Sequence, residues 1–333
     1  MEKKQLIIFA AAAFGLPILM GILMGIGYYQ GNDIIAFPNA QMYYPAAGVM
    51  LALLFTKRKE ELLPKKFYIG FLMTTAVMMI TAIVSIIMPQ LNWMALGQIP
   101  IIIFSIICLI LLLLEKKEVR AAYGLRFLNG KKSWLCMLLF LGLYILRLFV
   151  NCLIEGQTTM FIDIFTDPMT YVMMFSLIIS FFLAFTAFFG EEYGWRYFFQ
   201  PLLQKRFGLK GGVFVLGVLW GLWHLPINIF YYSPDTWMIS VCLQLITCIS
   251  LGIFFGYGYM KTENIWVPVV MHYINNNMIA VVTGTADIGN QVYRLADIPI
   301  MIVINLIFAV FIFSKVYKRE APVTPPEDLS NIQ

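Results

Sequence analysis

The sequence predicts an all-α fold, a polytopic transmembrane helical bundle of about ten spans. The first observation is composition: 61% of the 333 residues are hydrophobic and 12% are charged, whereas a soluble domain is about half apolar and a quarter charged. The second is that the apolar residues form runs long enough to cross a bilayer. The third is the alternation of basic residues between successive connections. Together they exclude a soluble fold, a disordered chain, a disulfide scaffold and a nucleic-acid binder.

Ten apolar runs bounded by charged residues are the predicted spans, in chain order. They lie near residues 6–28, 41–56, 67–88, 95–114, 134–154, 170–190, 212–232, 237–260, 265–284 and 297–314. The second is the weakest, because Asn39 and Gln41 shorten its apolar run. The first is too long for a signal peptide and no small-residue cleavage site follows it, so we interpret it as a membrane anchor.

The basic residues indicate how these spans are oriented. With ten spans, 21 of the 23 Lys and Arg residues fall on one side, Arg294 falls on the other, and Arg147 lies inside a span. Connections rich in Lys and Arg stay in the cytoplasm. The prediction is therefore an integral membrane protein with both termini cytoplasmic. The five cysteines all lie inside predicted spans, and we interpret them as packing residues.

The polar motifs divide the chain into regions. Residues 1–133 are expected to form an N-terminal four-span region that ends in a basic inner loop. Residues 134–318 are expected to form a second membrane domain, whose motif-bearing core is 190–280. Residues 319–333 are polar and rich in proline, and are expected to be a disordered cytoplasmic tail.

The first polar motif is Glu191-Glu192-Tyr-Gly-Trp-Arg196, at the expected inner end of the sixth span. Ionisable residues at membrane depth are costly and are functional candidates by default. Glu192 and Arg196 are four residues apart and share one helix face, so we expect them to pair and to fix the helix end. Glu191 is turned about 100° away and would point into the bundle. The alternative is that all three residues form a solvated helix end.

The only two histidines, His224 and His272, both lie in predicted spans. His224 is expected roughly 18 Å along its span, with Trp220 one turn earlier, where it could shape a pocket. His272 and Asn276 are four residues apart and share a face, which suits two hydrogen-bond donors directed at one point. A packing histidine and a polar seam that holds helices together are the alternatives.

The four groups Glu191, His224, His272 and Asn276 are expected in the same half of the membrane, because their spans start or end on the same side. Their agreement in depth is incomplete. Glu191, at the end of its span, is expected to lie shallower than His224. A sixth helix that is buried more deeply at its inner end would remove this difference.

These residues resemble the motifs of the CAAX protease and bacteriocin-processing family of intramembrane proteases, which includes the type II CAAX prenyl endopeptidases. The family pattern has a Glu-Glu-x-x-x-Arg box, an aromatic-x-x-x-His box and a His-x-x-x-Asn box. In this chain the boxes read, in the same order, Glu191-Glu192…Arg196, Trp220…His224 and His272…Asn276. Trp stands where Phe is common in the family. The resemblance covers residues 190–280, roughly a quarter of the chain.

The resemblance implies an enzyme, an intramembrane endopeptidase that acts on a membrane-associated peptide or protein near the cytoplasmic face. Its setting would be the lipid bilayer of a bacterial plasma membrane. Glu191 would match the catalytic glutamate that activates water, and His224 would help to hold that water. His272 and Asn276 would match the pair that stabilises the substrate carbonyl as it becomes an oxyanion.

The remaining motif residues, Glu192, Arg196 and Trp220, would support the site structurally. No Ser or Cys nucleophile stands beside the motifs, so direct attack by water is favoured. Glu191, His224 and His272 would also satisfy the three-ligand rule of a catalytic zinc site. The chain has no His-Glu-x-x-His motif, and a metal-free mechanism would use the same residues.

Two functions from other classes stay open on the sequence alone. One is a non-catalytic membrane immunity or scaffolding protein of the same family, which would keep the polar residues only as a seam between helices. The other, less favoured, is a small-solute transporter with a polar site at the bilayer midplane. No internal repeat supports the transporter.

Overall fold

The computed structural model of this chain describes residues 2–57, 62–285 and 287–318, and within these ranges all regular secondary structure is helical. The predicted all-α class is therefore confirmed. The predicted tail, 319–333, lies outside the described residues. Apolar segments of this kind form helices because a helix satisfies the backbone hydrogen bonds within the segment, where no water is available.

The α-helices follow one another along the chain with short connections. They are α1 (Glu2–Ala10), α2 (Leu16–Tyr29), α3 (Ala36–Gln41), α4 (Tyr44–Thr56), α5 (Lys65–Ile87), α6 (Trp93–Leu96), α7 (Gln98–Leu113), α8 (Lys117–Ala122), α9 (Gly130–Ile154), α10 (Thr158–Thr166), α11 (Pro168–Glu192), α12 (Gln200–Trp223), α13 (Leu225–Ile227), α14 (Trp237–Thr262), α15 (Trp266–Thr283) and α16 (Asp297–Ala309).

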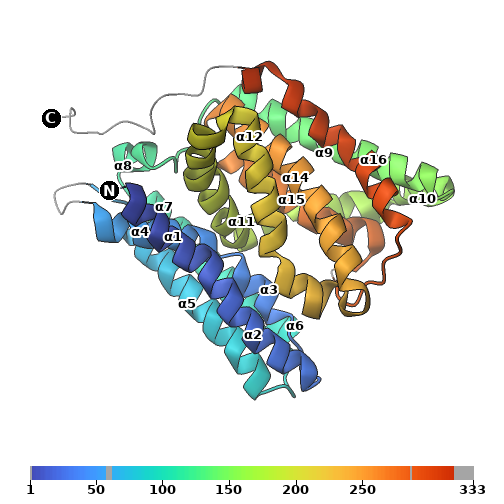
Figure 1. Ribbon diagram of the computed structural model, residues 1–333, viewed down its shortest axis with the longest axis horizontal. Helices are drawn as coiled ribbons and strands as arrows, with labels where there is room; N and C mark the ends of the chain where they lie inside the picture. Colours follow the sequence, from blue (N-terminus) through green and yellow to red (C-terminus); the bar gives the residue numbers. More distant parts are fainter. Residues whose placement is uncertain (1, 58–61, 286, 319–333) are drawn as a thin grey trace.

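Shorter helical turns of other types join some of these helices. Three are π-helical, namely η1 (Ala11–Gly15), η2 (Tyr193–Phe199) and η3 (Asn228–Tyr232). The others are 3₁₀ turns, η4 (Pro234–Thr236), η5 (Val310–Phe313) and η6 (Lys315–Lys318). In Figure 1 the blue to cyan helices α1–α7 lie on one side of the molecule and the green to red helices α9–α16 on the other.

Six helical segments among the described residues are long and apolar enough to cross a membrane. They are Glu2–Tyr29, Lys65–Ile87, Trp93–Leu113, Gly130–Ile154, Pro168–Trp223 and Pro234–Thr262. The predicted count of ten is not confirmed. One reason is that α4 has 13 residues and Asp297–Phe313 is a shorter apolar helix. Another is that two predicted spans, 170–190 and 212–232, are joined within the 56-residue segment Pro168–Trp223.

A sharp reversal at Gly208 divides that long segment. Gly208 has φ 73° and ψ 168°, a conformation that only glycine adopts without strain. The two arms then pack closely, because a Cβ on Gly212 would lie 2.5 Å from the backbone nitrogen of Gln204. The chain therefore runs helically from Pro168 past Glu192 to the reversal, and residues 209–223 return beside it.

This reversal corrects the expectation that the sixth span ends near residue 190. The helix continues through η2, so Glu191 is not at a helix end. Glu191 is 17 residues and His224 is 16 residues from Gly208, one on each arm. Both therefore lie roughly 20–25 Å from the reversal along their arms. The reversal removes the reason for the expected difference in depth between Glu191 and His224, because the chain runs about 17 residues past Glu191 before it turns back at Gly208.

The helices on either side of the expected boundary at 133 share one continuous apolar core. Gly190 and Gly194 allow α11 and η2 to approach α4 and the segment before it closely. A Cβ at Gly190 would lie 2.4 Å from the carbonyl oxygen of Met42, and a Cβ at Gly194 would lie 2.3 Å from Pro45 Cβ. α4 and the segment before it therefore lie directly against the helix that carries Glu191. The division into two domains remains a prediction.

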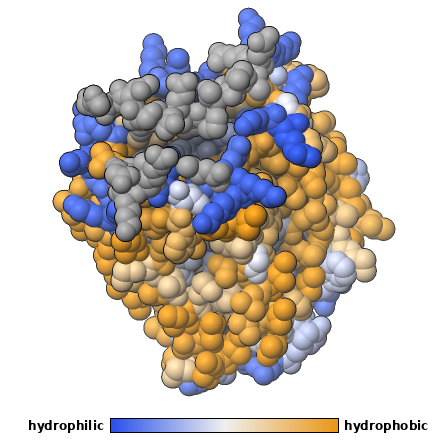
Figure 2. Space-filling model, turned by 60° about the vertical axis from the view of Figure 1, so that its left-hand side comes forward, coloured by the Kyte–Doolittle hydropathy of each residue, from blue (hydrophilic) through white to orange (hydrophobic). Residues whose placement is uncertain are grey.

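Contacts between distant connections define two ends of the bundle. At one end the contacts join three pairs of segments: Glu2 with Lys205, Lys66 with Glu115, and Asn129 with Thr262. At the other end they join Asn32 with Ile86, Tyr231 with Asn290, and Thr236 with Tyr293. Figure 2 shows hydrophilic side chains gathered at one end of the molecule, above a broad hydrophobic surface. This distribution matches a protein whose middle faces lipid.

The reversal yields a prediction about stability. Gly208→Ala should lower the free energy of unfolding by about 1–3 kcal/mol, because alanine is strained at this φ and ψ. The matched control is Gly142→Ala in α9. Neither glycine has an atom within 4 Å of the added Cβ, and only Gly208 has a positive φ. Alanine in the helical α9 should leave stability unchanged or slightly raised. Thermal unfolding in detergent compares the two, and equal melting temperatures would contradict the prediction.

Candidate functional site

The two glutamates lie where α11 passes into the π-helical turn η2. A π-helical turn inside a longer helix is uncommon and occurs frequently at functional sites. Here the stacked rings of Phe189, Tyr193 and Tyr197 line one side of the turn, with centroids 4.8 and 4.4 Å apart. This packing holds the widened turn in place within the bundle.

Glu192 is fully buried and is shared by two partners, Arg196 and His272. Its Oε2 lies 3.0 Å from Arg196 Nε, as predicted from the i,i+4 spacing. Its Oε1 accepts a hydrogen bond from His272 Nδ1 at 2.9 Å. The second contact was not predicted, because His272 lies 80 residues further along the chain and no sequence spacing points to it. The solvated helix end considered as an alternative is wrong for Glu192 and Arg196, which are both 0% exposed.

Arg196 is held by the single carboxylate and by aromatic rings. Its guanidinium lies 4.8 Å from the ring centroid of Trp220 and 5.5 Å from that of Phe255. Within the part of the chain that the structure describes, Nη1 and Nη2 are buried without a hydrogen-bond partner. The faces of the two rings thus supply the remaining stabilisation of this buried cation.

Trp220 is the residue that connects the motifs. Its Nε1 donates to Glu191 Oε2 at 2.7 Å, and its ring lies 5.4 Å from the ring of His272 and 6.0 Å from that of His224. The predicted supporting role is therefore a direct hydrogen bond to the carboxylate of Glu191. The side chain of Glu191 points into the bundle, as predicted, and is 2% exposed.

His224 lies at the junction of α12 and α13, followed by Pro226. Its Nδ1 lies 2.7 Å from the carbonyl oxygen of Trp220. A carbonyl oxygen only accepts, so Nδ1 carries the hydrogen and Nε2 of the neutral ring carries the lone pair. The carbonyl oxygen of His224 accepts from the side-chain amide of Asn228 at 2.9 Å, which stabilises this junction. The fixed ring thus presents Nε2 as an acceptor.

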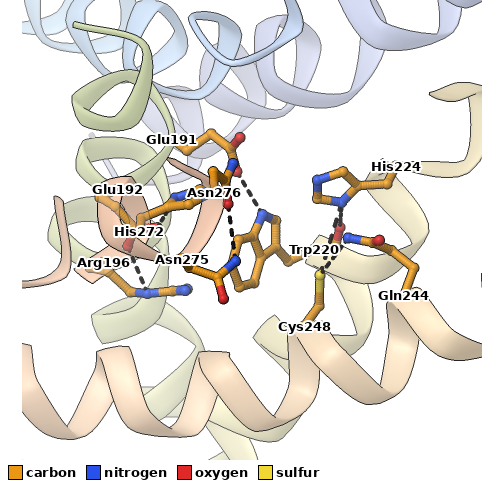
Figure 3. A network of polar contacts seen from close by, with 10 residues as sticks. All are labelled: Glu191, Glu192, Arg196, Trp220, His224, Gln244, Cys248, His272, Asn275 and Asn276. Carbon is orange, nitrogen blue, oxygen red and sulfur yellow. Dashed lines mark hydrogen bonds and ion pairs between the residues drawn. The ribbon is translucent and has the colours of Figure 1, made fainter. Parts of the chain in front are cut away.

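Asn276 is one turn beyond His272 on α15, and it is exposed. Its Oδ1 accepts from Asn275 Nδ2 at 3.0 Å, a contact that the sequence did not predict. Figure 3 shows Glu191, His272 and Asn276 on one side of Trp220 and His224 on the other. The structure thus gathers the other six predicted site residues around Trp220.

The suggested metal-ligand set is not assembled. Among the described residues, no group of three His, Cys, Asp or Glu side chains is arranged to hold a metal ion. Nδ1 of each ring is already engaged, that of His272 by Glu192 and that of His224 by the Trp220 carbonyl oxygen, so only Nε2 of each ring remains as a ligand atom. In this arrangement Glu191, His224 and His272 are not grouped as a three-ligand zinc site.

Comparisons with known proteins bear on the same part of the chain. Residues 173–278 match a family model described as type II CAAX prenyl endopeptidase Rce1-like. The chain is also 26% identical over 121 residues to CAAX prenyl protease 2 of Methanococcus maripaludis, a match that covers 34% of this chain and 45% of that protein. The match thus spans less than half the length of this curated relative. No solved structure matches the chain at a significant level.

The matched region contains all three boxes, from Glu191 to Asn276. The resemblance predicted from the boxes is confirmed: residues 173–278 are similar in sequence to the type II CAAX prenyl endopeptidases of the Rce1-like group.

Proposed function

We propose that this chain is an intramembrane endopeptidase that hydrolyses a peptide bond of a membrane-associated peptide or protein by means of a water molecule activated by Glu191. The observation that carries the proposal is the buried network of Glu191, Trp220, His272 and Glu192 inside the matched region. A network of charged groups in an apolar bundle is costly. If these polar residues served only to hold helices together, two adjacent carboxylates with separate partners would not be required.

The reaction requires a base for water. Glu191 removes a proton from the water as its oxygen attacks the carbonyl carbon of the scissile bond. As the carbon–nitrogen bond breaks, the same carboxyl group returns the proton to the leaving nitrogen, so the products are a carboxylate terminus and an amine. The hydrogen bond from Trp220 Nε1 orients the carboxylate at 2.7 Å. His224, through Nε2, accepts a hydrogen bond from the attacking water.

The developing oxyanion requires hydrogen-bond donors. Glu192 accepts from Nδ1 of His272 and is its counterion when the ring carries both hydrogens. His272 then donates from Nε2 to the carbonyl oxygen. Asn275 Nδ2 donates to Oδ1 of Asn276. Nδ2 of Asn276 is then the second donor to the carbonyl oxygen. Removal of one such donor from comparable sites costs about 3 kcal/mol of barrier.

The proposed mechanism contains no metal ion, because the three candidate ligands do not fit one. The substrate class follows from the matched family, so a protein with a lipid-modified C-terminus is one candidate and an unmodified membrane peptide is the other. If the substrate is the lipid-modified protein, cleavage should require the lipid. If the network is only structural, we expect the chain to act in bacteriocin immunity and to hydrolyse no peptide bond.

For the topology we propose ten crossings, with both termini in the cytoplasm of a bacterial cell. The contacts at the two ends of the bundle support this arrangement, because each of them joins connections that the ten-span model puts on the same side. Short helices such as α4 are protected from lipid by their neighbours, since Tyr44–Leu53 is almost entirely buried. The basic connections then face the cytoplasm.

The topology predicts the positions of reporters. A tag at either terminus should report from the cytoplasm, and a tag in the connection at residues 285–296 should report from the opposite side. The reason is the charge asymmetry of the connections. The measurement is reporter-enzyme activity or protection from protease in intact cells. A C-terminal tag that reports from outside the cell would overturn the ten-crossing arrangement.

The catalytic assignment predicts different effects for the two glutamates. Glu191→Gln keeps an oxygen acceptor for Trp220 but removes the base, so peptide cleavage per folded molecule should fall by about 10²–10⁴-fold at unchanged stability. Glu192→Gln is the matched control. It leaves Arg196 without its buried counter-charge, so it should lower stability by about 3–5 kcal/mol.

Glu192→Gln should also reduce specific activity, because it removes the negative charge beside His272. Arg196→Gln should lower stability but retain more activity per folded molecule, since the Glu192–His272 contact remains. The measurements are cleavage of a model peptide in liposomes and thermal unfolding of each variant. Near-normal specific activity in folded Glu191→Gln would contradict the mechanism.

The tryptophan network predicts a contrast between Trp220→Phe and Trp223→Phe. Each change removes one buried indole donor, from Glu191 in the first case and from the carbonyl oxygen of Ala13 in the second. Loss of a hydrogen bond to a charged group is worth about 1.5–3 kcal/mol, so Trp220→Phe should lower cleavage about 10- to 100-fold. Trp223→Phe should lower stability and reduce specific activity less than Trp220→Phe does. Equal effects on specific activity would rule out a positioning role for Trp220.

A further inference from the structure

A cavity lined in part by lysines lies away from the Glu191 network, at the end of the bundle where Asn129 meets Thr262. Its volume is about 390 Å³. It is lined by Lys132, Tyr257, Lys261, Ser314, Lys315 and Val316. Nothing in the proposed peptidase mechanism uses these side chains.

Three segments that are distant in sequence build the cavity. Lys132 is in the first turn of α9, Tyr257 and Lys261 are near the end of α14, and the other lining residues follow η5. Hydrogen bonds hold these segments together. Asn129 Nδ2 donates to Thr262 O at 2.7 Å, and Tyr317 Oη donates to Ile253 O at 2.6 Å. The walls are therefore fixed before any ligand binds.

The charge of the cavity is strongly positive. Three exposed lysines, Lys132, Lys261 and Lys315, line it, and within the described ranges none of them forms an ion pair with a carboxylate. Lys261 Nζ donates only to the Tyr257 hydroxyl, at 2.6 Å. Lys132 also lies in the first turn of a 25-residue helix, where the helix dipole disfavours a cation. A bound anion would reduce both the repulsion among the three lysines and the unfavourable interaction of Lys132 with the helix dipole.

A hydrogen-bond donor without a partner also lines the cavity. In the part of the chain that the structure describes, Ser314 Oγ is buried and has no hydrogen-bond partner. A buried hydroxyl without a partner costs free energy. Three ammonium groups together with one free hydroxyl match the acceptor oxygens of a phosphate group.

The surroundings of the cavity indicate the source of the phosphate. Side chains that neighbour the lining residues are large, apolar and exposed: Trp134 is 61%, Leu135 58% and Phe313 68% exposed. Lys210 Nζ adds a fourth ammonium group, 5.6 Å from the ring centroid of Phe313. A cationic surface and a lipid-facing surface therefore lie next to each other. An amphipathic ligand requires both surfaces, whereas a free ion requires only the cationic one.

We propose that this cavity binds the phosphate group of an anionic phospholipid, with the acyl chains lying along Leu135 and Phe313. The three lysines neutralise the phosphodiester, and Ser314 donates to one of its oxygens. Binding would join the end of α14 to the start of α9 and to the C-terminal segment. This site is independent of the proposed peptidase reaction.

The experiment uses the full chain, purified and placed in nanodiscs of phosphatidylglycerol or phosphatidylcholine, with retained lipid counted by native mass spectrometry after transfer to detergent. The test variant is Lys261→Gln/Lys315→Gln. The matched control is Lys116→Gln/Lys117→Gln, which removes the same charge from exposed lysines outside the cavity. Retained phosphatidylglycerol should exceed phosphatidylcholine. The test variant should weaken its retention at least about tenfold, and the control less than about twofold.

Ser314→Ala is a second variant that leaves the charge unchanged, and it should weaken retention several-fold. Melting temperatures confirm that each variant is folded. Equal losses in the test and control pairs would overturn the proposal in favour of general surface attraction. Equal retention of the two lipids would also overturn it. Displacement of phosphatidylglycerol by an equal concentration of inorganic phosphate would show an anion site with no lipid specificity, and would likewise overturn the lipid assignment.

Discussion

The arrangement of the motif helices depends on one buried carboxylate, that of Glu192. A charge without access to water must be compensated by its neighbours, and Glu192 meets this requirement with Arg196 on its own helix and His272 on α15. The hydrogen bond to His272 fixes how α15 is rotated against α11. Because Asn276 follows one turn later on α15, its position depends on the same contact. A neutral residue at 192 would leave both Arg196 and His272 without a counter-charge inside an apolar bundle.

Trp220 extends this network to the other motifs. It donates to Glu191, covers the guanidinium of Arg196, and supplies the carbonyl oxygen that orients His224. It can do so because the reversal at Gly208 brings residues 209–223 back along the helix that carries the two glutamates. A single turn thereby places Glu191 and His224 at similar distances from the reversal, as the proposed sharing of one water molecule by these two residues requires.

The helices before residue 133 form a wall of the site. Trp223 donates to the carbonyl oxygen of Ala13, and Gln41 donates to the carbonyl oxygen of Trp223. Gly190 and Gly194 lie so close to Met42 and Pro45 that no side chain would fit between them. These contacts keep lipid and bulk water away from the carboxylates on that side. In a closed environment of this kind, hydrogen bonds to a developing charge are stronger than they are in water.

The sequence by itself determined the helical class, the membrane setting, the three motifs and the pairing of Glu192 with Arg196. These features depend on local quantities, namely the length of apolar runs and the spacing of residues on one helix face. Only the tertiary structure decided the contact of Glu192 with His272, the contact of Glu191 with Trp220, the passage of the sixth helix beyond Glu192, and the failure of Glu191, His224 and His272 to form a metal-ligand group. The helix could not be traced from the sequence because the charged residues from Glu191 to Arg196 look like the end of a span, whereas they are buried and the chain continues through a π-helical turn to Gly208. The partners could not be found because side chains 29 and 80 residues apart meet only when helices pack.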